Sequence, residues 1–108
     1  MKSWYKWWLL LLILPLFILA SDKGDVAKGK EVFSSRCAAC HGTSGEGKEA
    51  IAKMFSVTMK QLGSKEVQSV GDATLKKDIL EGNGKMRPVT LTDQEVTDVI
   101  AFLRTLKK

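Results

Sequence analysis

The sequence predicts a small all-α domain, and three observations support this. Apolar residues recur at every third or fourth position near the C-terminus, which is the spacing of a helix. Residues that cap helices, namely Asp25, Asp72 and Thr92, stand before candidate helical segments. No segment shows the apolar–polar alternation of a β-strand. The 108 residues suffice for one domain, which excludes a large multi-domain enzyme, a repeat solenoid and a polytopic membrane protein.

The positive charge of the chain does not indicate a nucleic-acid interface. The formal net charge is +5, and leaving out Lys2 and Lys6 of the N-terminal segment lowers it to +3. The remaining basic residues are spread along the chain among acidic ones, and no run of five or more like charges occurs. We interpret them as a solvated, lysine-rich surface and expect no nucleic acid among the partners.

Residues 1–20 have the pattern of an export signal. Two lysines in Met1–Lys6 precede the apolar run Trp7–Ala20, which is shorter than the ~20 residues that span a bilayer. We expect a signal peptide cleaved near Ala20, and the alternative is an N-terminal membrane anchor with tryptophans at the interface. Either outcome makes residues 21–108 the folded domain and places it outside the cytoplasmic membrane.

The first predicted helix begins after Asp25, a good N-cap, and places Val26, Gly29 and Phe33 on one face. A glycine inside a helix costs up to ~1 kcal/mol relative to alanine. Gly29 therefore suggests a close approach by another element, and a tolerated surface glycine is the alternative.

All the cysteine and histidine of the chain lies in the segment Cys37-Ala38-Ala39-Cys40-His41. A zinc site would need a second pair of ligands, which the sequence lacks. A thioredoxin-like redox pair would need a βαβ context, and a disulfide across two residues would stabilise little. The remaining interpretation is C-x-x-C-H, the covalent attachment site of a c-type haem.

The spacing of this motif suits haem chemistry. Two thiols three positions apart on a helical turn can form thioethers with the two vinyl groups at one porphyrin edge, and the next residue can project its imidazole to the iron. We therefore predict one covalent haem c, attached through Cys37 and Cys40, with His41 as an axial ligand of its iron. Export agrees with this, because such haem attachment takes place outside the cytoplasmic membrane.

The middle of the chain predicts short elements. Residues 43–48 form a glycine-rich loop, and residues 49–62 show loosely helical apolar spacing. Residues 64–70 suit one short turn. Asp72 is predicted to cap a helix over Ala73–Glu81. The side chains of that helix predicted to face inward are Leu75, Ile79 and Leu80.

The C-terminal helix has the clearest pattern. Thr92 and Glu95 form a capping box, and Leu91 with Val96 form a hydrophobic staple. Beyond them the apolar face continues at helical spacing through Val99, Ile100, Leu103 and Leu106, with Phe102 at its flank.

The chain has one histidine, so the candidates for the second axial position are Met54, Met59, Met86, a lysine, or no ligand. Met54 and Met59 lie in the loosely helical stretch, where a methionine usually fills a gap in the core. Met86 lies within residues 82–88, whose glycines and proline disfavour regular structure, so that this loop can present Met86 to the haem. We predict Met86 as the ligand and Met59 as the alternative. A methionine raises the reduction potential relative to a second histidine.

With these motifs, residues 26–106 resemble the small class I c-type cytochromes of bacteria. The markers are Gly29 with Phe33, the C-x-x-C-H-G segment at 37–42, the glycine-rich segment with Met86, and the amphipathic C-terminal helix. The resemblance implies the class I cytochrome c fold, with three to five helices wrapped around one covalently bound haem. It also implies a close crossing of the first and last helices, at Gly29 and Phe102. Relatives usually carry Met followed directly by Pro, whereas here Arg87 intervenes.

The motifs and this resemblance predict a periplasmic one-electron carrier rather than an enzyme, because an iron with two protein ligands has no open position for oxygen. The periplasmic domain is expected to be either soluble or anchored to the inner membrane. We expect a monomer whose redox partner proteins dock transiently and are steered by charge. The alternatives are a membrane-anchored subunit of a larger oxidase or reductase, and a sensor in which a gas displaces Met86. Candidate steering cations are Lys48, Lys53, Lys60, Lys85 and Arg87.

The haem would also complete the core. Large apolar side chains are few after residue 20, and the porphyrin offers apolar area in their place. We therefore expect a chain without haem to be unfolded or molten. A carbonyl near residues 48–53 is expected to accept a hydrogen bond from the outer nitrogen of His41.

Overall fold

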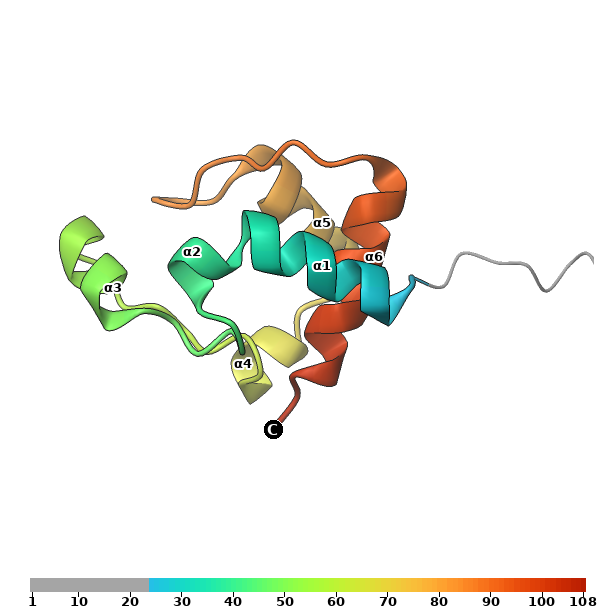
Figure 1. Cartoon of the computed structure of the whole chain (residues 1–108). Coiled ribbons are helices and arrows are strands. Elements are labelled where there is room, and N and C mark those ends of the chain that lie inside the picture. Colours follow the sequence, from blue (N-terminus) through green and yellow to red (C-terminus); the bar gives the residue numbers. More distant parts are fainter. Residues whose placement is uncertain (1–23) are drawn as a thin grey trace, which may run out of the picture.

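A computed structural model of the protein describes residues 24–108, which form helices joined by loops (Figure 1). Within these residues there is no strand, only an isolated antiparallel bridge between Asn83 and Met86. The prediction of an all-α domain is confirmed. The helices are α1 (Val26–Arg36), α2 (Ala38–His41), α3 (Glu49–Phe55), α4 (Lys65–Gln68), α5 (Asp72–Glu81) and α6 (Asp93–Thr105).

The predicted leader, residues 1–20, lies outside the described residues, so its cleavage or retention stays a prediction. From residue 24 onward, no helix is both long and apolar enough to cross a membrane.

The core is centred on the crossing of α1 and α6. The rings of Phe33 and Phe102 lie 5.2 Å apart between centroids and are tilted by 53°. A Cβ at Gly29 would collide with the backbone carbonyl of Asp98 and would lie 3.0 Å from the Cβ of Phe102. The predicted close approach at Gly29 is therefore confirmed, and its tightest contact is with Asp98. The buried apolar residues are Phe33, Ala38, Leu75, Ile79, Val96, Val99, Ile100, Phe102 and Leu103.

A buried carboxylate joins the start of α1 to this crossing. Asp98 is only 3% exposed, and its Oδ1 accepts the backbone N–H of Asp25 at 2.7 Å and the side-chain amide of Gln94 at 2.8 Å. Asp25 in turn caps α1, because its carboxylate accepts the N–H of Lys28 at 3.1 Å, as predicted. One buried group thus fixes the residue at which α1 begins.

The beginning of α6 has the predicted capping box. The hydroxyl of Thr92 accepts the N–H of Glu95 at 3.1 Å, and the Glu95 carboxylate accepts the N–H of Thr92 at 2.9 Å. Both exchanges satisfy amides that the helix itself leaves without partners.

The prediction that Asp72 caps α5 is wrong. Gly71 occupies the N-cap, and Asp72 is the first helical residue. The Asp72 carboxylate instead accepts two hydrogen bonds from the Arg104 guanidinium, at 3.1 Å from Nε and 2.6 Å from Nη2. Both bonds reach the same oxygen, Oδ1, so the carboxylate is engaged by α6 and makes no cap hydrogen bond to α5. Of the side chains predicted to face inward, Leu75 and Ile79 are buried, and Leu80 is half-buried against the core.

The stretch 49–62 is helical only in its first half. α3 ends at Phe55, Ser56 after it has a left-handed φ of 55°, and none of the residues of α3 is buried. Met54 is 71% exposed, so the expectation that it fills a gap in the core is wrong. Residues 64–70 contain the single turn α4, as expected.

We predict that Gly29→Ala lowers the free energy of unfolding by about 1–3 kcal/mol, the usual cost of forcing extra volume into a packed core. Denaturant unfolding of the haem-loaded protein, followed by circular dichroism, measures this change. Gly71→Ser is the matched control, because no atom lies within 4 Å of a Cβ at that position and serine is a good N-cap. Equal stability of the two variants would contradict the role assigned to the crossing.

Candidate functional site

The motif side chains are held on one helical turn at the end of α1. The backbone N–H of Cys37 donates to the carbonyl of buried Phe33 at 2.8 Å. In α2, the N–H groups of Cys40 and His41 both donate to the Cys37 carbonyl, at 3.2 and 3.0 Å. The structure therefore brings the predicted Cys37, Cys40 and His41 together on one turn, directly beside the core.

The two cysteines are free thiols in different surroundings. Cys37 is half-buried and packs against the core, whereas Cys40 is exposed. Burial raises the pKa of the Cys37 thiol, and the positive charge of Arg36 partly opposes this effect. Ala38, between them, is itself part of the core. Cys37 and Cys40 thus lie on a turn that packs against the core rather than on an exposed loop.

The imidazole of His41 is half-buried, and burial lowers its pKa. Its Nδ1 atom is fully covered and has no hydrogen-bond partner. The expectation that a carbonyl near residues 48–53 accepts a hydrogen bond from the outer nitrogen is therefore wrong. A lowered pKa favours the neutral imidazole, which is the form that binds a metal ion.

The loop after α2 folds back onto the motif. The N–H of Gly47 donates to the His41 carbonyl at 2.7 Å, and the N–H of Lys48 donates to the Cys40 carbonyl at 3.1 Å. The carboxylate of Glu46 accepts the N–H of Ser44 at 3.0 Å within the same loop. A role for Glu46 was not foreseen from the sequence, although an acidic residue between two glycines is a signal that its side chain can serve nearby backbone amides.

Met86 lies on a separate, anchored turn. Asn83 and Met86 exchange backbone hydrogen bonds of 3.1 and 2.9 Å, and the N–H of Val89 returns to the Ile79 carbonyl of α5 at 2.8 Å. Met86 is half-buried and packs against the same core as Cys37. In Figure 1 the loop that carries Met86 runs toward the end of the molecule where α2 and α3 lie.

The other two methionines that could serve as ligands lie on or beside α3. Met59 is half-buried and lines a hollow of about 550 Å³ together with Lys48, Ala52 and Val57. Neither His41 nor Met86 lines this hollow. Met54 is 71% exposed. The hollow thus lies beside α3 and includes Met59, the alternative ligand, but neither His41 nor Met86.

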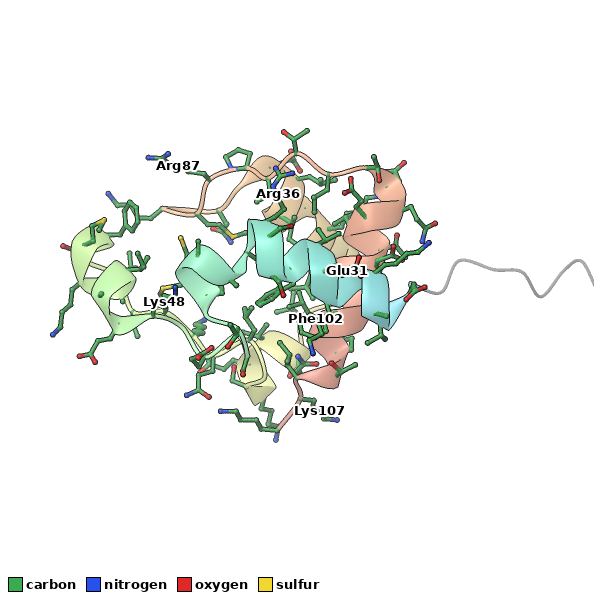
Figure 2. All side chains as sticks on the ribbon, in the orientation of Figure 1. Glu31, Arg36, Lys48, Arg87, Phe102 and Lys107 are labelled. Atoms are coloured by element: carbon green, nitrogen blue, oxygen red, sulfur yellow. The ribbon has the colours of Figure 1, made fainter. Side chains whose placement is uncertain are left out.

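The predicted steering cations fall into two groups. Lys53 pairs with Glu49 at 3.4 Å, and Lys60 pairs with Glu66 at 3.1 Å. Among residues 24–108, the salt bridges do not involve Lys48, Lys85 or Arg87, and all three are exposed. Figure 2 shows Lys48 at the end of the molecule near α3, and Arg87 extending from the loop above it. The second group therefore offers cations that form no salt bridge among these residues.

The donor atoms of this site fit a c-type haem. Two thiols without a disulfide and an imidazole come from one turn, and the imidazole nitrogen Nδ1 is already covered by protein, which leaves Nε2 to bind iron. The described part of the chain holds no cluster of three or more His, Cys, Asp or Glu side chains that could bind a metal ion by itself. The residues therefore suit covalent attachment of a prosthetic group that brings its own iron.

Comparisons with known proteins agree with this chemistry. The family model described as "Cytochrome c" matches residues 26–107. Cytochrome c-554(547) of Halothiobacillus neapolitanus is 33% identical over 90 residues, which cover 78% of this chain and 99% of that protein.

Two solved structures share the fold. The KustC0563 c-type cytochrome superposes with a TM-score of 0.64 at 25% identity, covering 74% of this chain and 98% of its own. A chain of the sulfane dehydrogenase SoxCD from Paracoccus pantotrophus gives a TM-score of 0.53 at 24% identity and covers 77% of this chain. This chain corresponds to 43% of that SoxCD chain, so the likeness concerns the fold of one part of it.

Proposed function

Because this chain belongs to the cytochrome c family, with covalently attached haem c as its cofactor, we propose that it carries single electrons between redox proteins of the cell envelope. When bound, haem c supplies an iron that changes valence by one electron. We further propose that the domain works in the periplasm, as the export pattern of residues 1–20 predicts.

We assign covalent attachment to Cys37 and Cys40 and the first axial position to His41. The observation that carries this assignment is their placement on one turn, with both thiols free and Nδ1 of His41 covered. The same turn is tied through Phe33 to the α1–α6 core. Because this turn is held by the core, an iron bound to it would change valence with little rearrangement of its ligands.

We assign the second axial position to Met86. Its turn is held by three backbone hydrogen bonds, and its side chain packs against the core that also supports Cys37. Exposed Met54 has no comparable support, and Met59 faces the hollow beside α3. With His41 and Met86 both bound, the protein leaves no position for dioxygen or another substrate, which favours a carrier over an enzyme.

We propose that partner proteins dock weakly at the end of the molecule that carries the motif and α3. Lys48 and Arg87 lie there without salt bridges, Lys85 is two residues before Arg87 in the same loop, and the three cations would attract an acidic surface. Interfaces between transient redox partners are small, so charge sets the encounter rate more than the affinity.

Attachment can be tested with the double variant Cys37→Ser, Cys40→Ser. Only nine apolar residues are buried between residues 24 and 108, and α3 buries none. We expect this variant, made in a host that matures c-type haem, to lose the cooperative thermal transition and most of its helical circular dichroism. Helical content equal to that of the haem-loaded protein would contradict the proposal that haem completes the core.

Ligation can be tested with Met86→Ala. We expect the weak sulfur-to-iron absorption band of the oxidised protein in the far red to disappear and the reduction potential to fall. Met54→Ala is the matched control and should change neither, because that side chain is 71% exposed. Loss of the band in Met59→Ala, with the band intact in Met86→Ala, would transfer the ligand role to Met59.

Charge steering can be tested with two small oxidants of opposite charge. Oxidation of the reduced protein by hexacyanoferrate(III) should slow as ionic strength rises from about 0.01 M to about 1 M, while oxidation by the cationic tris(phenanthroline)cobalt(III) should accelerate. Lys85→Gln should weaken both trends, whereas Lys28→Gln, at the far end of α1, should leave them unchanged. Salt-independent rates with both oxidants would argue against steering.

A further inference from the structure

The residue after the motif adopts a conformation that favours glycine. Gly42 is buried and has a φ of 82°. A Cβ at this position would collide with the carboxylate of Glu46, so the Glu46 side chain lies directly over the Gly42 backbone. The loop therefore closes on itself immediately after His41.

Glu46 holds the loop in this closed form. Its carboxylate accepts the N–H of Ser44 at 3.0 Å and also interacts with its own backbone N–H. These backbone hydrogen bonds, its own N–H first, lower the pKa of Glu46, and the charges of Lys48 and Lys108 act in the same direction. The group is therefore a carboxylate at neutral pH, and a carboxylate can only accept hydrogen bonds, as it does from Ser44.

His41 depends on this loop because its ring has no hydrogen bond of its own at Nδ1. A histidine that binds a metal usually donates its other ring N–H to a fixed acceptor, which sets the orientation of the ring. In this chain the polar anchors of His41 are on the main chain: its N–H donates to Cys37, and its carbonyl accepts from Gly47 at 2.7 Å. Gly47 is the residue that follows Glu46.

A second contact holds a different part of the same loop. The N–H of Leu62 donates to the Gly45 carbonyl at 2.8 Å, which ties the outer side of the loop to the segment before α4. That bond does not involve Gly42, Ser44 or the Gly47 amide. Within the inner part of the loop the Gly45 N–H donates to the Gly42 carbonyl at 3.1 Å, and the Glu46 carboxylate contacts both Gly42 and the Ser44 amide.

We propose that Glu46 is a positioning residue for His41: its carboxylate closes the loop over Gly42 and so presents the Gly47 N–H to the His41 carbonyl. The consequence is a fixed orientation of the imidazole without an acceptor at Nδ1. This inference rests on the proposed role of His41 as an iron ligand and adds the residue that orients it.

The test compares Glu46→Ala and Glu46→Gln with wild type, all as haem-loaded protein. The first readout is the set of hyperfine-shifted haem methyl signals in the proton NMR spectrum of the oxidised protein, which depends on ligand orientation. The second is the reduction potential. The third is the hydrogen exchange rate of the Gly47 amide, which reports the loop directly and can be read even where the haem signals are broad.

We expect Glu46→Ala to rearrange the methyl signals, to shift the potential and to raise the Gly47 exchange rate about threefold to tenfold, the worth of one net hydrogen bond. Glu46→Gln keeps one acceptor oxygen and should produce smaller changes in the same direction. Glu49→Gln is the matched control: it also removes one negative charge close to the motif, but Glu49 pairs with Lys53 on α3. It should leave the methyl pattern and the Gly47 exchange rate unchanged.

The proposal would be overturned if Glu46→Ala had the haem methyl signals and the Gly47 exchange rate of wild type. It would also be overturned if Glu49→Gln changed both readouts as much as Glu46→Ala does. Failure of the proposed ligation by His41 would be distinguished from failure of the Glu46 proposal by a separate variant. If His41 were not a ligand, His41→Ala would keep the low-spin spectrum of wild type, whatever the Glu46 variants show.

Discussion

The crossing of α1 over α6 at Gly29 is the contact on which the rest of the structure depends. Without a side chain at this point, the backbone of α1 lies against the Asp98 carbonyl and lets Phe33 meet Phe102. α2 follows α1 after the single residue Cys37, so the crossing also sets where the thiols and the imidazole stand. The functional site is therefore an extension of the packed core.

Polar side chains extend this small core toward the loops. The Gln68 amide donates to the carbonyls of Leu62 and Leu103, both at 2.9 Å, and so joins the segment before α4 to α6. Arg104 donates to the carbonyls of Gln68 and Val70 while it pairs with Asp72. The accepting carbonyls lie in loops or in the last turn of a helix, where intrahelical donors are few. Two long side chains thus attach α4 and the start of α5 to a core of few apolar residues.

Much of this architecture could be predicted from local sequence signals. The beginnings of α1 and α6 and their caps follow from short-range rules, because the capping residues and their partners lie three positions apart. The close approach at Gly29 is indicated by the cost of a glycine inside a helix, and the family resemblance implies that the last helix is its partner. The motif at residues 37–41 is equally local. Apart from the partner of Gly29, these features are specified by neighbours in the chain.

The features that could not be predicted depend on contacts between distant residues. Asp72 has the sequence signature of a cap, but Arg104, 32 residues away, takes its carboxylate. The covered Nδ1 of His41 depends on how the loop folds, and the sequence carries no signal for an absent acceptor. The exposure of Met54 follows from the end of α3 at Phe55, which spacing alone does not indicate.

The turn that carries Met86 and the turn that carries Cys37, Cys40 and His41 are supported unequally by the core. The turn at Asn83–Met86 adds only half-buried Met86 to the core and contains no buried residue, whereas α2 includes buried Ala38. Elements with little buried apolar contact open at lower free energy than the global transition. On warming, the turn that carries Met86 should therefore open as a separate local event. The turn that carries Cys37, Cys40 and His41 should stay folded until the whole domain unfolds.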